Sequence, residues 1–181
     1  MSKIINNWKI MELFFNNPNR DFHIRESAKL IAINPMTASK YLDKFVKENL
    51  LLKRKERNNI LFSANTENIL FKEEKKHYNI IKIMKSGLIK YFEKELNYPK
   101  SIILFGSYAK GENIQESDID IFIMSEIKKK FNLEKFEKIL KADMQLFIYS
   151  KKEFNEMKKK NKELLNNIIN GVKLSGFIEV I

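Results

Sequence analysis

Two apolar segments that flank a short glycine-containing loop constrain the fold of this chain more than any other feature. Residues 101–105, Ser-Ile-Ile-Leu-Phe, have the β-branched and aromatic composition that is typical of a buried strand. In residues 118–123 carboxylate and apolar side chains alternate, so Asp118 and Asp120 share one face of a second strand and the isoleucines share the other. Adjacent strands would therefore bring the intervening loop and the two carboxylates to one place.

The loop between these strands has residues that suit a phosphate group. Gly106 lets the backbone approach a ligand without a Cβ clash, and Ser107 adds a hydroxyl beside the backbone N–H groups of a short helical turn. Gly111 allows a tight exit turn. Lys110 either stabilises phosphate charge or is a solvated loop lysine. We predict that Gly106, Ser107 and Lys110 bind a nucleotide.

The two alternating carboxylates suggest a hard divalent cation. Carboxylates held side by side repel each other, which is costly unless a cation lies between them. The chain has no cysteine and two histidines that are far apart in sequence, so thiolate zinc sites are excluded and a histidine-based site has little support. Oxygen ligands favour Mg²⁺ or Mn²⁺, which bridge nucleotide phosphates. The alternative is a plain β-turn followed by a strand with a polar edge.

The joint motif resembles a known enzyme family. The stretch GSYAKGENIQESDIDIFI is similar to the signature of the DNA polymerase β-type nucleotidyltransferases, and most of all to the minimal nucleotidyltransferases. The resemblance covers roughly residues 78–181 and is supported by NNIINGVKLSG near the C-terminus. It implies a small mixed sheet with flanking helices. It also implies that Gly106 and Ser107 hold the phosphates of ATP or another nucleoside triphosphate, and that Asp118 and Asp120 bind Mg²⁺ or Mn²⁺.

The same resemblance implies a function. Minimal nucleotidyltransferases transfer a nucleoside monophosphate, most often AMP from ATP, to an acceptor, and many of them act as antitoxins that modify a partner toxin. The family also has a third carboxylate on a following strand, for which residues 142–148 are the candidate. Gln145 stands at the best-fitting position, and Asp143, two residues earlier, shares its face. We predict Asp143 as the third catalytic and metal-binding residue; without it the site would hold a nucleotide but transfer it slowly or not at all.

The first third of the chain has the pattern of three helices followed by a basic hairpin. Helical spacing of apolar residues predicts helices over 4–15 and 23–32, and Asn34 before Pro35 predicts the start of a third over 35–48. A basic run at 53–57 and a strand-like segment at 60–62 follow. Residues 22–55 resemble winged helix-turn-helix regulators.

That second resemblance covers about the first 65 residues and implies DNA binding. The helix after the turn would enter the major groove and the basic hairpin, or wing, would contact the backbone. Winged helices also serve as dimerisation or protein-interaction modules. By position, seven residues are the candidates for DNA contact: Thr37, Ser39, Lys40, Lys44, Arg54, Lys55 and Arg57.

Length and charge agree with this organisation without requiring it. A chain of 181 residues fits one domain or two small ones. The net charge of +11 favours polyanionic partners, although a solvated lysine surface explains it as well. We expect an α/β (α+β) protein with a winged helix-turn-helix at 1–65, a helical linker at 66–77 and a minimal nucleotidyltransferase domain at 78–181. An amphipathic helix is expected to continue from 66 to 96, and two short helices to meet near Asn161.

Three functional hypotheses remain open at this level. The first is a metal-dependent nucleotidyltransferase coupled to DNA binding. The second is a DNA-binding regulator whose nucleotidyltransferase domain is degenerate and senses a nucleotide or binds a partner. The third is a partner-binding protein with a dimerising winged helix. The sequence has neither the form of a signal peptide nor a window of membrane-spanning length, so we expect a cytoplasmic protein with no membrane partner and possible homodimers.

Overall fold

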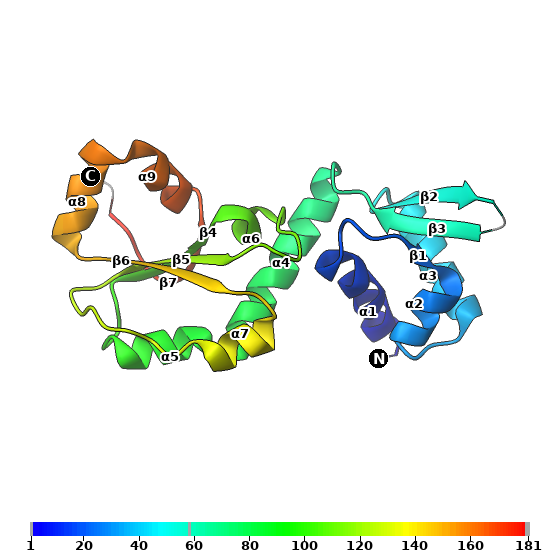
Figure 1. Cartoon of the computed structure of the whole chain (residues 1–181), viewed down its shortest axis with the longest axis horizontal. Helices are drawn as coiled ribbons and strands as arrows, with labels where there is room; N and C mark the ends of the chain where they lie inside the picture. Colours follow the sequence, from blue (N-terminus) through cyan, green and yellow to red (C-terminus); the bar gives the residue numbers. More distant parts are fainter. Residues whose placement is uncertain (1, 58, 180–181) are drawn as a thin grey trace. The chain divides into compact units, whose positions relative to one another are not determined.

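The structure is a computed structural model that describes residues 2–57 and 59–179. Its contacts divide the chain into two compact units, Met1–Lys75 and Lys76–Ile181. The described residues form nine helices and two sheets, a mixed α+β architecture of the expected class (Figure 1). Among these residues no helix is both long enough and apolar enough to cross a membrane.

The first unit consists of three helices and a three-stranded antiparallel sheet. In chain order the elements are α1 (Ser2–Asn16), β1 (Phe22–His23), α2 (Ile24–Leu30), α3 (Pro35–Lys47), β2 (Leu51–Glu56) and β3 (Asn59–Ala64). The sheet order is β1-β3-β2, so β2 and β3 form a hairpin and the short β1 pairs with the other edge of β3. The helices lie within two residues of the expected bounds.

Local sequence explains how α3 is placed. The Asn34 side chain accepts a hydrogen bond from the Met36 N–H at 2.8 Å, and Pro35 occupies the first turn, where its missing N–H costs nothing. Ala38, Leu42 and Phe45 form the buried stripe of the helix. The opposite side of α3 is left to polar and basic residues.

The second unit is a four-stranded mixed sheet flanked by helices. Its elements are α4 (Ile69–Ser86, which starts in the first unit), α5 (Leu88–Glu95), β4 (Ser101–Phe105), α6 (Gly106–Lys110), β5 (Ile119–Met124), α7 (Glu134–Leu140), β6 (Met144–Tyr149), α8 (Lys151–Lys160), α9 (Lys162–Ile169) and β7 (Val172–Gly176). The sheet order is β6-β5-β4-β7. Strand β4 is antiparallel to both neighbours, whereas β5 and β6 are parallel.

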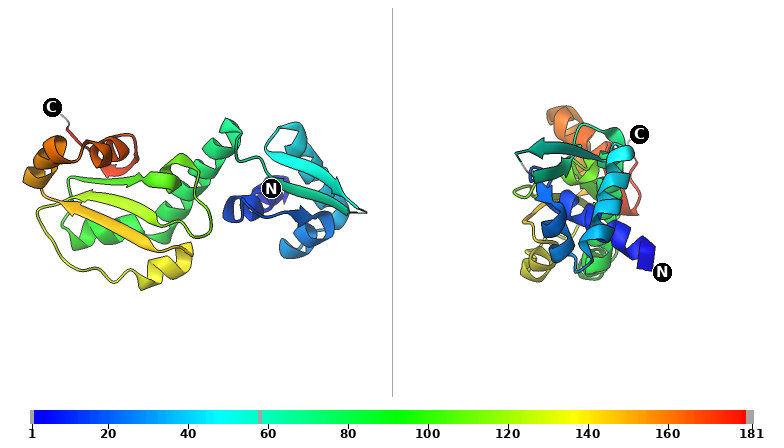
Figure 2. Two further views of the ribbon diagram at one scale, coloured as in Figure 1. Left: turned by 45° about the horizontal axis from the view of Figure 1, so that its top comes forward. Right: turned by 90° about the vertical axis from the view of Figure 1, so that its right-hand side faces the viewer.

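Side-chain alternation on the central strands creates two cores. Ile119, Ile121 and Ile123 of β5 join residues of α5 and α7 in one cluster, which confirms their predicted common face. Phe122 and Met124 join residues of α8 and α9 in the other. Figures 1 and 2 show these helix pairs covering opposite faces of the sheet. Asp120 therefore lies on the α8–α9 face, near the start of the strand, where it is half-buried.

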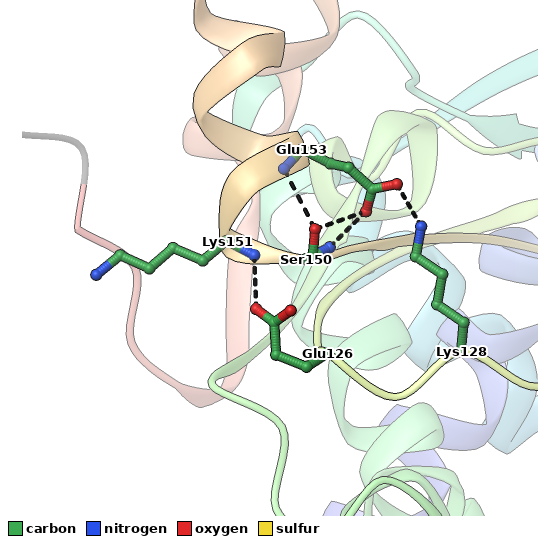
Figure 3. Close-up of polar contacts among 5 residues, drawn as sticks. All are labelled: Glu126, Lys128, Ser150, Lys151 and Glu153. Atoms are coloured by element: carbon green, nitrogen blue, oxygen red, sulfur yellow. Dashed lines mark hydrogen bonds and ion pairs between the residues drawn. The ribbon is translucent and has the colours of Figure 1, made fainter.

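A set of side-chain caps fixes the start of α8 (Figure 3). The Ser150 hydroxyl accepts from the Glu153 N–H at 3.3 Å, and the Glu153 carboxylate accepts from the Ser150 N–H at 2.8 Å. Lys128 pairs with Glu153, and Glu126 accepts from the Lys151 N–H at 3.0 Å. The Lys128 ammonium and then the Ser150 donors lower the pKa of Glu153 to about 2. The loop after β5 is thereby tied to the helix that follows β6.

The expected long helix over 66–96 is interrupted, which corrects the sequence-based prediction. Gly87 adopts a left-handed conformation with φ of 83° and separates α4 from α5. The Ser86 hydroxyl accepts from the N–H of Leu88, the first residue of α5, at 3.2 Å. The amphipathic period continues across the break because both helices pack on the same face of the sheet. Near Asn161 the expected junction of two short helices, α8 and α9, is present.

Candidate nucleotide-binding site

The site begins where β4 runs directly into the short helix α6. Gly106 makes this turn with φ of 71°, a conformation that favours glycine. A Cβ atom at this position would lie 2.2 Å from Oδ2 of Asp120, so the glycine backbone and the carboxylate occupy adjoining space. The contact follows from strand pairing, because Phe105 stands opposite Asp120 in the β4–β5 register. The glycine-serine turn and one of the two carboxylates therefore form one site.

The carboxylate pair occupies the start of β5. Asp118 is exposed and directly precedes the strand, and Asp120 is half-buried within it. Burial raises the pKa of Asp120 above its ordinary value, and the charge of Asp118 raises it further. Within the described part of the chain, no hydrogen bond or ion pair reaches either carboxylate. A pair of uncompensated carboxylates fits a divalent cation, which would favour the ionised form of both.

Strand β6 supplies the two candidates for the third position. Its parallel register pairs Asp120 with Gln145, and the Ile119 N–H donates to the carbonyl oxygen of Asp143 at 2.8 Å. Paired residues on neighbouring strands share a face, so Gln145 lies beside Asp120 and Asp143 lies beside Asp118. Gln145, whose side chain ends in an amide, therefore occupies the position beside Asp120.

Asp118 and Asp143 also line a common hollow of about 400 Å³. Its other lining residues come from the loop before β5 and from α7 and the loop after it: Gln115, Glu116, Ser117, Glu134, Glu137, Lys138, Lys141 and Ala142. Across residues 2–57 and 59–179, no three His, Cys, Asp or Glu side chains are close enough to hold a metal ion by themselves. The two aspartates of β5 therefore fit a cation that takes its remaining ligands from phosphate or water, and Asp143 does not complete a cluster with them.

Ser107 and Lys110 differ in how firmly the structure holds them. Ser107 is half-buried in α6, and its carbonyl oxygen accepts from the Glu112 N–H at 3.0 Å, which helps to close the turn. Lys110 is exposed, and in the described residues its ammonium forms no ion pair. Its side chain can reach a phosphate without first breaking an internal contact.

Sequence reasoning missed a buried polar network behind this turn. Asn79 of α4 donates to the Tyr108 carbonyl oxygen at 3.0 Å and to Oδ1 of Asn113 at 2.8 Å. Burial raises the pKa of Tyr108, the charge of Asp118 adds to the rise, and a hydrogen bond with Asn113 opposes it. The available signal was an asparagine on the stripe that Phe71 and Ile83 bury on α4.

The seven residues expected to meet DNA fall into two groups in the first unit. Some already have partners: Arg54 pairs with Asp21 and Glu56, both at 2.7 Å, and Lys44 pairs with Glu48 at 3.6 Å. The Ser39 hydroxyl lies 3.4 Å from Asp43, and Thr37 is half-buried near the start of α3. Lys40, Lys55 and Arg57 are exposed and make no ion pair with any described residue.

A second hollow, of about 820 Å³, adjoins the start of α3. It is lined by residues of the β1–α2 corner, of the start of α3 and of β3: His23, Ile24, Arg25, Glu26, Pro35, Met36, Asn59 and Ile60. Arg25 is exposed there and was not among the predicted contacts. Its position next to the start of α3 and the hairpin strand β3 was not evident from sequence spacing.

Comparisons with known proteins agree with the geometry of the second unit. The family model described as "Nucleotidyltransferase domain" matches residues 85–174, the span from the end of α4 into β7. A Methanocaldococcus jannaschii protein that is named as a candidate protein adenylyltransferase is 46% identical over 41 residues. That match covers 23% of this chain and 41% of the relative, so the chain spans about two fifths of that protein's length. No solved structure gives a significant match.

Residues 85–174, most of the second unit, therefore match a nucleotidyltransferase domain, and the α+β fold of the unit is consistent with that type. The matched span contains Gly106, Ser107, Asp118 and Asp120, together with the strands β4 and β5 that bring them close to one another.

A Gly106→Ala substitution tests whether the turn and Asp120 share space. The added methyl group would meet the carboxylate, so we expect loss of stability and at least a tenfold weaker affinity for Mg²⁺-ATP, roughly the cost of one displaced polar contact. Isothermal titration and denaturant unfolding measure both quantities. Gly87→Ala is the matched control. Gly87 has φ of 83°, and a Cβ atom there would meet no other atom within 4 Å, so this variant has the backbone strain without a steric clash. Equal behaviour of the two variants would contradict the shared site.

An Asp120→Asn substitution tests the electrostatic cost of the carboxylate pair. Because the folded pKa of Asp120 is raised, the folded state holds its proton to a higher pH than the unfolded state does. This group therefore makes the free energy of unfolding fall as pH rises from the ordinary aspartate pKa through the raised one. The asparagine variant should lack that fall and have a higher melting temperature at pH 7 than the wild type. Thermal unfolding between pH 3 and 8 (about the titration range of carboxylates) checks this, with the exposed Glu163→Gln as control. A lower melting temperature at pH 7 would contradict it.

Proposed function

We propose that this protein transfers a nucleoside monophosphate, AMP from ATP in the simplest case, to a hydroxyl group of an acceptor. The observation that carries the proposal is the contact between Gly106 and Asp120 inside the span that matches the nucleotidyltransferase domain. It joins a turn suited to phosphate and a carboxylate suited to a cation in one site. Neither motif alone would support the proposal as well.

The residues of the turn bind the triphosphate. Gly106 leaves room for a phosphate oxygen next to the backbone, and the Ser107 hydroxyl and the α6 backbone supply donors. Lys110, which is exposed and forms no ion pair with any residue that the structure describes, adds positive charge to the outer phosphates.

The carboxylates of Asp118 and Asp120 would hold Mg²⁺ or Mn²⁺. When bound, such an ion neutralises phosphate charge and makes an acceptor hydroxyl more acidic. In the reaction, the acceptor oxygen forms a bond to the α-phosphorus while the bond from that phosphorus to the pyrophosphate oxygen breaks. Pyrophosphate leaves with the electron pair. We assign to Asp143 the removal of the hydroxyl proton from the acceptor; the support is that Asp143 lines the same hollow as Asp118.

We favour a protein as the acceptor. The support is the name of the M. jannaschii relative, a candidate protein adenylyltransferase, and the 41 residues over which it matches this chain. An antitoxin role, in which the acceptor is a partner toxin, is the specific form of this proposal.

For the first unit we propose a winged helix-turn-helix that binds DNA. Its support is the order of three helices and a hairpin, with α3 as the capped helix after the turn and β2–β3 as the wing. Lys40 on α3 and Lys55 on β2 are exposed cations that pair with no acidic residue in the described part of the chain, and Arg25 at the neighbouring hollow joins them as a candidate. Arg54 is assigned mainly to holding the wing to Asp21.

One observation favours a second candidate function, a DNA-binding regulator that senses a nucleotide without transferring it. The position beside Asp120 is occupied by the amide of Gln145, which cannot act as a base and is a poor Mg²⁺ ligand. The exposed Asp143 carboxylate lies two residues before Gln145, beside Asp118.

Transfer of a label separates the two candidates. The protein is incubated with α-³²P-ATP, Mg²⁺ and extract from its host or a co-encoded protein, and labelled products are resolved on gels. We expect a labelled acceptor with the wild type and a loss of at least about a hundredfold with Asp118→Ala/Asp120→Ala, since both positions serve charge stabilisation in the transition state. The exposed Glu163→Ala variant is the control. ATP binding without transfer to any acceptor would favour the sensor.

Salt dependence of DNA binding tests the first unit. Lys40→Ala and Lys55→Ala should each weaken binding to genomic fragments, and each should reduce the slope of log K against log salt by about 1 for every phosphate that the variant no longer neutralises. Fluorescence anisotropy at several salt concentrations measures this, with Lys162→Ala in the second unit as control. A slope that does not change in either the α3 or the wing variant would exclude these lysines as phosphate ligands.

A further inference from the structure

The asparagine on the buried stripe of α4 has an unusual environment. Asn79 is 3% exposed, one turn before Ile83, which is 1% exposed and belongs to the apolar core. A buried amide costs free energy unless its hydrogen bonds are satisfied. Its place on the buried face of α4 indicates that its contacts serve a purpose that a leucine could not.

Those contacts reach two segments that are far away in the sequence. Both hydrogen bonds leave the same amide nitrogen, one to the carbonyl oxygen of Tyr108 in α6 and one to Oδ1 of Asn113 in the following loop. An amide nitrogen has two donors, so both are used. Asn113 is 6% exposed and is therefore buried with Asn79.

The two segments form the phosphate turn and the connection to the carboxylate pair. Tyr108 follows Ser107 in α6, whose last turn is closed by the left-handed Gly111. After Asn113, the Ile114 N–H donates to the Ser117 hydroxyl at 2.9 Å, and Asp118 comes next. The Asn79 side chain thus ties the turn and the loop together from behind, through a backbone carbonyl oxygen of one and a side-chain amide oxygen of the other.

We infer that Asn79 is a positioning residue. It fixes the α6 turn relative to the loop that leads to Asp118, in the arrangement that nucleotide binding needs. Its meaning for catalysis rests on the proposed nucleotidyl transfer, whereas its effect on the turn does not. Asn79 is buried behind the turn, so it acts through the neighbouring Ser107 and Asp118.

Hydrogen–deuterium exchange on the free protein tests the structural half. Asn79→Ala and Asn79→Asp both lose the donors to Tyr108 and Asn113, and the second variant keeps the size of the side chain and so remains a test if the first fails to fold. We expect faster exchange over residues 106–117 in both. Ile83→Val is the matched control on the same helix stripe: it should lower the melting temperature without a local increase in exchange there.

Nucleotide affinity tests the functional half. Titration of Mg²⁺-ATP should show a Kd raised about tenfold by Asn79→Asp and unchanged by Ile83→Val, with transfer assays showing a higher KM for ATP rather than a proportional loss of kcat. Faster exchange over 106–117 confined to the Asn79 variants supports the inference even if the wild type transfers no nucleotide, a result that would defeat only the proposed reaction. Equal exchange in all variants, or an ATP-binding wild type whose Kd is unchanged by Asn79→Asp, overturns it.

Discussion

The contact between the Gly106 backbone and the Asp120 carboxylate is the constraint on which the site depends. Antiparallel pairing of β4 with β5 sets Phe105 opposite Asp120, and the chain must then leave the sheet in a left-handed conformation beside that carboxylate. Only glycine meets both demands, because it tolerates the positive φ and has no Cβ to fill the space of Oδ2. The rest of the second unit supports this point: the isoleucine face of β5 is buried against α5 and α7, and α8 and α9 cover the other face, on which Asp120 is half-buried.

The electrostatic surroundings of Asp120 disfavour its ionised form in the folded chain. Burial and the neighbouring Asp118 both disfavour the charge on Asp120, and no described residue donates to it. The chain nevertheless has a net charge of +11, so lysines are plentiful but are not placed at the pair. Lysine at this point would neutralise the carboxylates permanently and close the site to a cation. A complex of a metal ion and a triphosphate would complement this site on both sides. Its cation would meet the uncompensated carboxylates, and its phosphate oxygens would meet the donors of the turn.

Periodicity predicted the parts of the structure that depend on neighbours in sequence. Spacing along the chain accounts for the two faces of β5, the Asn34 cap and the short helices α8 and α9. Adjacency of two strands accounts for the closeness of the glycine turn to Asp120. Tertiary pairing decided the rest. The break at Gly87 does not interrupt the apolar period, Arg54 meets Asp21 across 33 positions, and Asn79 meets its partners across 29 and 34. The choice between Asp143 and Gln145 required the β5–β6 register, which no local pattern contains.

That register also divides the site into two ends. Residues two apart on a strand are separated by about 7 Å, and neighbouring strands by about 4.8 Å. Asp120 therefore adjoins Gly106 and Gln145, whereas Asp118 adjoins Asp143 and the hollow next to α7. The first end has the turn that suits phosphate; the second has open volume and a carboxylate that no described residue pairs. The neutral amide of Gln145 adds no repulsion to the Asp120 carboxylate, whose pKa is already raised, and the proposed function assigns the base to the other end of the site. In the proposed function, transfer therefore depends on Asp143, which directly precedes β6, and not on Gln145, which lies beside Asp120.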